Sequence, residues 1–174
     1  MPKYLLLILF SLLAVIVIGW LGSSVIKSSQ KNTPKNGPVA PDFTLRSREG
    51  REITLSSYKG KVIYIKFWAS WCGDCIKQVV PQRHLEEELK TNSNLVFINI
   101  SVDTNEEAWK KAVVRNKLKA IELISNGGQE GNVNELYGID EIPRYVLIGK
   151  DGKIIEDHAP FPSELDINYF KDYL

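Results

Sequence analysis

The sequence is poor in the residues that bind metals or form disulfide networks, since its 174 residues include two cysteines, two histidines and one methionine. A structural zinc site takes about four ligands. Neither His84 nor His158 has the spacing needed to join Cys72 and Cys75 in such a site. The two cysteines can form one bridge at most, so the fold must rest on a hydrophobic core, for which the chain is long enough.

A strong excess of charge of one sign is also missing. The chain has 22 basic and 21 acidic residues and a formal net charge of +1. Domains that bind nucleic acids usually carry a clear excess of lysine and arginine. We therefore expect no nucleic-acid partner and little steering of substrates by overall charge. We also expect the chain to be a monomer.

One stretch lacks charge altogether, the 23 residues from 4 to 26 (YLLLILFSLLAVIVIGWLGSSVI). About 20 apolar residues suffice for a helix to cross a bilayer. Residues 1–26 are therefore expected to be a transmembrane anchor or, alternatively, a signal segment cleaved near Gly22 or Ser24; the anchor is favoured. Lysines flank both sides of the run, and those that follow it would, taken alone, favour a cytoplasmic domain.

The remainder of the chain divides into a linker and one domain. Residues 27–40 (KSSQKNTPKNGPVA) are polar and rich in Ser, Lys, Asn and Pro, which is typical of a flexible linker. Residues 41–174 alternate between strand and helix patterns. Strands are expected at 61–68, 94–102 and 120–124, hairpins at 43–55 and 144–157, and helices after Cys72, over 105–117 and over 162–174. Asn105 or Thr104 is expected to cap the helix over 105–117, and Glu49 and Gly50 to lie in the turn of the first hairpin. This order predicts an α/β domain with a central mixed sheet flanked by helices.

The two cysteines lie in the segment KFWASWCGDC, where the apolar strand at 61–68 gives way to a helix. The first turn of a helix carries free N–H groups and a partial positive charge, which favour a thiolate at Cys72. Cys75 follows one turn later and is expected to point inward. An exposed thiolate with a neighbour that can attack a mixed disulfide is the arrangement used in thiol–disulfide exchange.

Several motifs together resemble the membrane-tethered TlpA/ResA-like thiol-disulfide oxidoreductases of the thioredoxin superfamily. They are APDFTL at 40–45, GKV at 60–62, FWASWCGDC at 67–75 and LYGIDEIPRYVLIGKDGKII at 136–155. The resemblance covers about residues 40–158. It implies a thioredoxin-like fold with an N-terminal β-hairpin, and a cis peptide bond before Pro143, beside the cysteine pair.

The resemblance also implies a function. Cys72 is expected to be the nucleophile and Cys75 the resolving cysteine, with Trp71, Ile142 and Pro143 framing the substrate site. Such a protein reduces disulfides of extracytoplasmic (periplasmic) proteins, among them cytochrome c apoproteins, with electrons from a membrane donor. No cofactor and no metal are expected, because the dithiol itself carries two electrons.

Three alternatives compete with this interpretation. A copper metallochaperone of the same fold would use the two cysteines and a distant histidine, for which His158 is a candidate, although such proteins usually space their cysteines by three residues. A peroxiredoxin would need a threonine at position 69, where the sequence has Ala69. A non-catalytic interaction domain would need neither sulfur.

Four residues depart from the family pattern. Asp74 replaces the usual proline between the cysteines. Two interpretations are open: an acid that only caps the first turn and suits the helix dipole, or a carboxylate that opposes a Cys72 thiolate and raises the pKa of that thiol. Lys66 stands where thioredoxin has a buried acid. We expect its ammonium to lie near Asp74 or Cys75, the alternative being a lysine that extends to solvent at the strand end. Gln78 replaces a frequent glutamate, and Pro81 comes one residue late, which suggests a local bulge in the helix.

Overall fold

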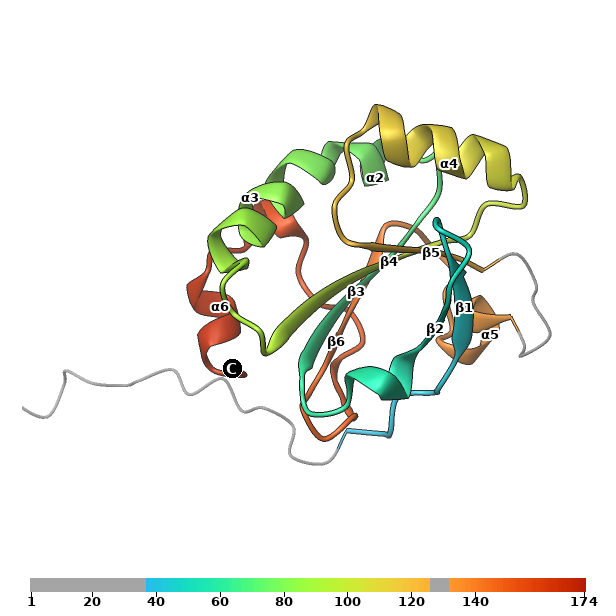
Figure 1. The fold of residues 1–174 in the computed structure, drawn as a ribbon. Helices are drawn as coiled ribbons and strands as arrows, with labels where there is room; N and C mark the ends of the chain where they lie inside the picture. The colour runs from blue at the N-terminus through green and yellow to red at the C-terminus, as the bar shows by residue number, and fades with distance from the viewer. Residues whose placement is uncertain (1–36, 126–131) are drawn as a thin grey trace, which may run out of the picture. The chain divides into compact units, whose positions relative to one another are not determined.

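The computed structural model describes residues 37–125 and 132–174 of the chain (Figure 1). The predicted anchor at 1–26 and most of the predicted linker lie outside these residues. Among the helices of the described residues, none combines the length and apolar character that a membrane crossing requires.

A mixed sheet forms the centre of the domain. Its strand order is β2-β1-β5-β4-β3-β6-β7. The three central strands are parallel: β3 (Val62–Trp68), β4 (Leu95–Ser101) and β5 (Ile121–Ile124). The outer strands pair antiparallel: β1 (Thr44–Ser47), β2 (Glu52–Thr54), β6 (Arg144–Ile148) and β7 (Ile154–Glu156). The predicted α/β, thioredoxin-like arrangement, parallel in the centre and antiparallel at the edges, is confirmed.

Helices cover both faces of this sheet. Figure 1 shows α2 (Gly73–Lys77), α3 (Val79–Leu89) and α4 (Glu106–Arg115) along one face. The short helix α5 (Val133–Leu136) packs against the opposite face, where Val133 joins a core cluster with Ile65 and Ile98. A turn of 3₁₀ helix at Leu55–Tyr58 follows β2. A second one at Pro162–Glu164 precedes the C-terminal helix α6 (Asn168–Lys171).

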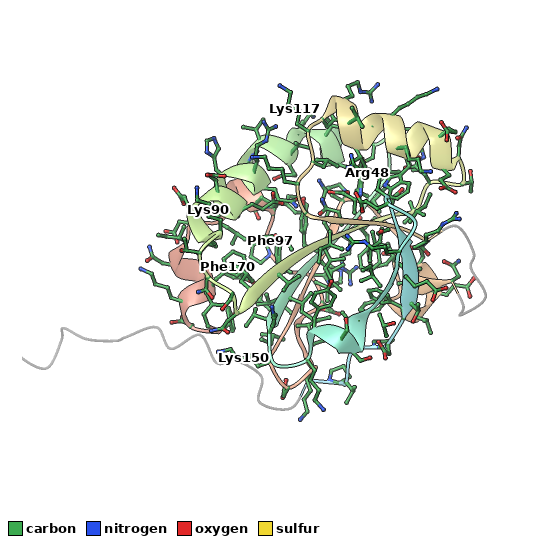
Figure 2. The ribbon with its side chains drawn as sticks, in the orientation of Figure 1. Arg48, Lys90, Phe97, Lys117, Lys150 and Phe170 are labelled. Atoms are coloured by element: carbon green, nitrogen blue, oxygen red, sulfur yellow. A yellow bond between two sulfur atoms is a disulfide. The ribbon has the colours of Figure 1, made fainter. Side chains whose placement is uncertain are left out.

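Side-chain alternation along β3 divides the core into two faces. Ile63, Ile65 and Phe67 point to the α5 side. Val62 and Tyr64, which alternate with them, point to the opposite face and pack against the helices α3 and α6. On that second face the rings of Phe97 and Phe170, both labelled in Figure 2, lie edge to face with their centroids 5.9 Å apart. Every residue of β3 is buried, which explains its near-continuous apolar sequence.

Two local predictions are confirmed by specific contacts. The side chain of Asn105 accepts a hydrogen bond from the backbone N–H of Ala108 and so caps α4. Gly50 adopts a positive φ of 81° in the turn between β1 and β2, a conformation that glycine tolerates best.

Two predicted segments differ from the structure. The continuous helix expected over 162–174 is absent, because Leu165 is extended and separates two short helical turns. Residues 38–40, assigned to the linker, form backbone hydrogen bonds with the β6–β7 hairpin: Ala40 donates to Gly152, and Pro38 accepts from Ile154. The folded domain therefore begins a few residues before the boundary expected from composition.

Candidate functional site

Cys72 and Cys75 form a disulfide with an S–S distance of 2.07 Å and a Cα–Cα distance of 5.2 Å. Cys72 directly precedes α2 at the carboxyl end of the central strand region, and 7% of it is exposed. Cys75 is completely buried. The two sulfurs thus differ in access, as the sequence predicted, and only Cys72 can be approached from solvent.

The N-terminus of α2 is built around the Cys72 sulfur. Cys72 occupies the N-cap position, and its Sγ accepts a hydrogen bond from the backbone N–H of Cys75 at 3.1 Å. When the disulfide is reduced, the same N–H faces the Cys72 thiolate. A hydrogen bond to the charged form of a group favours that form, so this contact favours the thiolate.

The segment around Pro143 lies beside the Cys72 sulfur. The Ile142–Pro143 peptide bond is cis, which confirms the prediction. The carbonyl oxygen of Ile142 is 3.9 Å from Cys72 Sγ. Trp71 is 71% exposed, and a hollow of about 170 Å³ next to it is lined by Trp71, Val102, Asn134, Ile139, Asp140, Glu141 and Ile142. The structure therefore brings Trp71, Ile142 and Pro143 together around Cys72.

Asp74 points away from the protein and pairs with Lys77. Its Oδ1 accepts a hydrogen bond from Lys77 Nζ at 2.7 Å, and both side chains are about three-quarters exposed. This hydrogen bond and the charge of Lys77 lower the pKa of Asp74. The part of our hypothesis that placed Lys66 beside Asp74 is wrong, because Asp74 and Cys75 are adjacent on α2 and project to opposite sides.

Lys66 is buried under the cysteine pair, with only 1% of its surface exposed. Its Nζ donates a hydrogen bond to the carbonyl oxygen of Cys75 at 3.1 Å and lies 5.7 Å from the centre of the Trp68 ring. The alternative, a lysine that reaches solvent, is therefore wrong, and the predicted proximity to Cys75 is confirmed. Burial lowers the pKa of Lys66 to about 8, against the opposing effect of the nearby Glu122 and Glu86 carboxylates.

Polar residues that the sequence analysis missed accompany Lys66. Asn99 and Glu122 occupy matching positions on β4 and β5, so Lys66, Asn99 and Glu122 form a row across three strands. Asn99 Nδ2 donates to Glu122 Oε1 at 2.7 Å. Burial raises the pKa of Glu122 to about 8. One signal could have found this row: two charges of opposite sign, each within an otherwise apolar strand.

The helix that carries the cysteines is interrupted at Gln78. This residue separates α2 from α3, so that Pro81 is the third residue of α3, where its missing N–H costs little. The expected irregularity is therefore a break rather than a bulge. Because of the break, the Cys75 carbonyl accepts from the Gln78 N–H at 3.3 Å as well as from Lys66. Gln78 Oε1 in turn accepts from the N–H of Ser163.

Among residues 37–125 and 132–174 there is no group of three or more His, Cys, Asp and Glu side chains that could hold a metal. His158, the candidate copper ligand, lies in an exposed position with its Nδ1 3.2 Å from Asp157 Oδ1.

The sequence of the chain matches that of a known protein family and of several named relatives. The model of the family described as Redoxin matches residues 35–173. The chain belongs to the Redoxin family. It is 31% identical over 129 residues to the thiol-disulfide oxidoreductase ResA of Bacillus cereus, covering 74% of this chain and 72% of that protein. It is 32% identical over 121 residues to ResA of Bacillus thuringiensis, covering 70% of this chain and 68% of that protein.

Solved structures of thiol-disulfide oxidoreductases have a similar fold. A thiol-disulfide oxidoreductase from Bacteroides fragilis superposes with a TM-score of 0.68 at 26% identity, over 79% of this chain and all of that one. The predicted membership of the TlpA/ResA-like group is confirmed, as is the predicted class of enzyme, since these relatives are named thiol-disulfide oxidoreductases.

Proposed function

We propose that this Redoxin-family protein reduces disulfides of extracytoplasmic proteins, with Cys72 as nucleophile and Cys75 as resolving cysteine. The observation that carries the proposal is the unequal placement of the two sulfurs. Cys72 Sγ is at the surface end of α2 and accepts the Cys75 N–H, whereas Cys75 is enclosed. One sulfur is thus suited to meet a partner, and the other to complete the reaction internally.

The chemistry proceeds in two exchanges. The Cys72 thiolate attacks one sulfur of a substrate disulfide, forms a mixed disulfide and releases the other substrate sulfur as a thiolate. The Cys75 thiolate then attacks Cys72 Sγ, which forms the Cys72–Cys75 bond seen here and releases the second substrate sulfur. Two electrons pass to the substrate, and no cofactor takes part. A membrane-borne dithiol donor would return the protein to its reduced form.

Asp74 and the hollow beside Trp71 support the direction and the substrate class. A negative charge close to Cys72 disfavours the thiolate, and a dithiol with a less stable thiolate is the stronger reductant. The exposed ring of Trp71 and the neighbouring Ile142 offer an apolar surface for an extended substrate segment. An apoprotein of cytochrome c, whose cysteines must be reduced before haem attachment, is a substrate of this kind.

We place the thioredoxin-like domain, which includes residues 38–40, outside the cytoplasm, tethered through residues 1–26 and the polar segment that follows them. The uncharged run in the sequence and the resemblance to membrane-tethered relatives support this arrangement. Protease treatment of intact spheroplasts tests it. Digestion of the domain, with a cytoplasmic marker left intact, is the expected result; a domain digested only after lysis would overturn the proposed location.

The activity is tested by reduction of insulin disulfides and by trapping of substrates. The wild-type protein should reduce insulin, and Cys72→Ser should not. Cys75→Ser should accumulate mixed disulfides with its natural substrates, because the second exchange is blocked. Cys72→Ser provides the matched control, since it retains the other sulfur and should trap nothing.

Two results would contradict the proposal. Full biological activity of Cys72→Ser would indicate an interaction domain that needs no redox chemistry. Tight Cu(I) binding that depends on His158, together with no reduction of insulin, would indicate a metallochaperone instead.

A further inference from the structure

The resolving step poses a problem of proton transfer that the structure makes explicit. Cys75 must lose its thiol proton before it can attack Cys72, yet its side chain is fully buried. Water therefore cannot take the proton directly. A thiolate formed in an apolar enclosure is also unfavourable unless a nearby group receives the proton and stabilises the charge.

Lys66 Nζ is the side-chain nitrogen in contact with Cys75. It donates to the carbonyl oxygen of that residue at 3.1 Å. This hydrogen bond places the amine of Lys66 against the residue whose thiol must lose its proton, and both side chains are completely enclosed by the protein. Nζ also lies 5.7 Å from the centre of the Trp68 ring.

Glu122 is fixed near Lys66 by a chain of amide contacts. Gln82 Nε2 donates to Asn99 Oδ1 at 3.0 Å, and Asn99 Nδ2 donates to Glu122 Oε1 at 2.7 Å. The other oxygen of Glu122, Oε2, is buried and has no hydrogen-bond partner among the described residues. Glu122 also lines a surface cavity of about 510 Å³, at whose rim lies Arg48, labelled in Figure 2.

We propose that Lys66 is the proton acceptor for the Cys75 thiol in the resolving step, and that Glu122 is a positioning residue that tunes Lys66. This inference rests on the proposed function. In the mixed disulfide, the Cys75 S–H gives its proton to the neutral amine of Lys66. The Cys75 thiolate forms the Cys72–Cys75 bond, the bond from Cys72 to the substrate breaks, and the substrate leaves as a thiolate. Lys66 then returns its proton to solvent, which restores the neutral amine.

All charged groups that face this site fit the assignment. The negative charges of Glu122 on β5 and Glu86 on α3 raise the pKa of Lys66. Tyr145, its partner on β6, is neutral because burial raises its pKa. Positive charges lower the pKa of each acid in turn. Lys66 and Arg48 act on Glu122, and Lys66, Lys119 and Arg83 act on Glu86.

The titration of Lys66 agrees with this geometry. Its pKa of about 8 leaves a useful fraction of neutral amine near pH 7, and a proton acceptor works best with a pKa near the working pH. Around pH 8, where Glu122 ionises, its carboxylate and that of Glu86 act in the opposite sense to burial and raise the pKa of Lys66. Removing Glu122 should therefore lower it.

The two exchanges can be timed separately with the reduced full chain and the chromogenic disulfide dithiobis(nitrobenzoate). The first release of coloured thiolate reports attack by Cys72, and its rate scales with reagent concentration. The second release reports attack by Cys75 and is independent of concentration. We expect Lys66→Met to slow the second release about a hundredfold at neutral pH and to leave the first unchanged.

Two further variants separate proton acceptance from structural support. Lys66→Arg keeps the charge but cannot accept a proton, so it should be as slow as Lys66→Met, whereas a purely structural role would be rescued. Glu122→Gln should shift the pH midpoint of the second release downward. Lys110→Met, which removes a surface lysine paired with Glu106, is the matched control and should behave as wild type.

The outcomes are distinct. A normal second release in Lys66→Arg, or an unmoved midpoint in Glu122→Gln, would overturn the assignment while leaving the proposed function intact. If Lys66→Met does not fold, these two variants still decide. Absence of the first release in the wild type would instead overturn the role of Cys72, and with it the proposed function.

Discussion

The carboxylate of Asp103 holds Ser70, two residues before Cys72, by both of its polar groups. Asp103 Oδ2 accepts from the Ser70 backbone N–H at 2.8 Å, and Oδ1 accepts from its hydroxyl at 2.7 Å. Asp103 also binds the hydroxyl of Ser101 at 2.7 Å and is itself buried. The loop that presents the cysteines is thereby fastened to the end of β4.

Replacing Asp103 should loosen this loop. Asp103→Ala leaves the half-buried donors of Ser70 and the buried hydroxyl of Ser101 without an acceptor, and we expect the free energy of unfolding to fall by about 3 kcal/mol. Ser70→Ala removes one hydroxyl contact only and should cost about 1 kcal/mol. Urea unfolding measures both. Equal losses in the two variants would show that Asp103 does not act through several bonds at once.

Trp71 should matter for protein substrates and not for folding. Its ring is largely exposed beside the Cys72 sulfur, so Trp71→Ala removes contact surface without opening a core cavity. We expect kcat/KM for a protein disulfide to fall about tenfold, in line with the loss of one aromatic contact. The rate with a small disulfide reagent should stay constant. A parallel loss for both substrates would argue against a docking role.

The exposed pair Asp74–Lys77 should tune the pKa of the Cys72 thiol in opposite directions. Asp74→Asn removes a negative charge and should lower this pKa, whereas Lys77→Gln removes a positive charge and should raise it. Each shift should be small and should shrink at high salt, because both side chains are solvated. Thiolate absorbance of the reduced protein, followed against pH, measures the shifts. A shift in the same direction in both variants would contradict this view.

Glu122 and Lys66 should make stability depend on pH in two limbs. The pKa of Glu122 rises from 4.5 to about 8 on folding, so between these values the folded state retains a proton that the unfolded chain has lost. Stability then falls as pH rises, by at most about 1.4 kcal/mol per pH unit. The pKa of Lys66 drops from 10.5 to about 8, so above pH 8 stability recovers.

Urea unfolding across this pH range checks the two limbs. Glu122→Gln should flatten the falling limb, with a remainder due to Glu86, whose pKa is also raised by burial. Lys66→Met should remove the rising limb. A wild-type stability that is constant between pH 5 and pH 8 would exclude a buried Glu122 of raised pKa.

Much of the fold follows from local sequence patterns. The strand β3 is predicted because seven successive residues are apolar apart from Lys66, and the cap of α4 because Asn105 precedes two acids. The C-terminal helix is wrongly predicted because helical periodicity does not reveal that Leu165 must extend to reach the core. Packing, which is non-local, overrides the local preference there.

The site could be predicted only where its residues are close in sequence or belong to a family motif. The cysteine pair and the proline at 143 meet this condition. Asp103 and Glu122 do not, because each reaches the site through the pairing of strands far apart in the chain. The choice between Asp74 and Cys75 as the partner of Lys66 stayed open for a related reason, since sequence distance cannot tell which side of a short helix each residue faces.

The attachment of residues 38–40 to the β6–β7 hairpin has a mechanical consequence. That hairpin joins the sheet near the beginning of β3, and Cys72 follows its end, so the entry of the chain and the sulfur are separated by the length of this strand. Seven extended residues span about 20 Å. Under the membrane attachment proposed above, the domain would therefore be held from the end that lies opposite Cys72, and the sulfur would face away from the point of attachment.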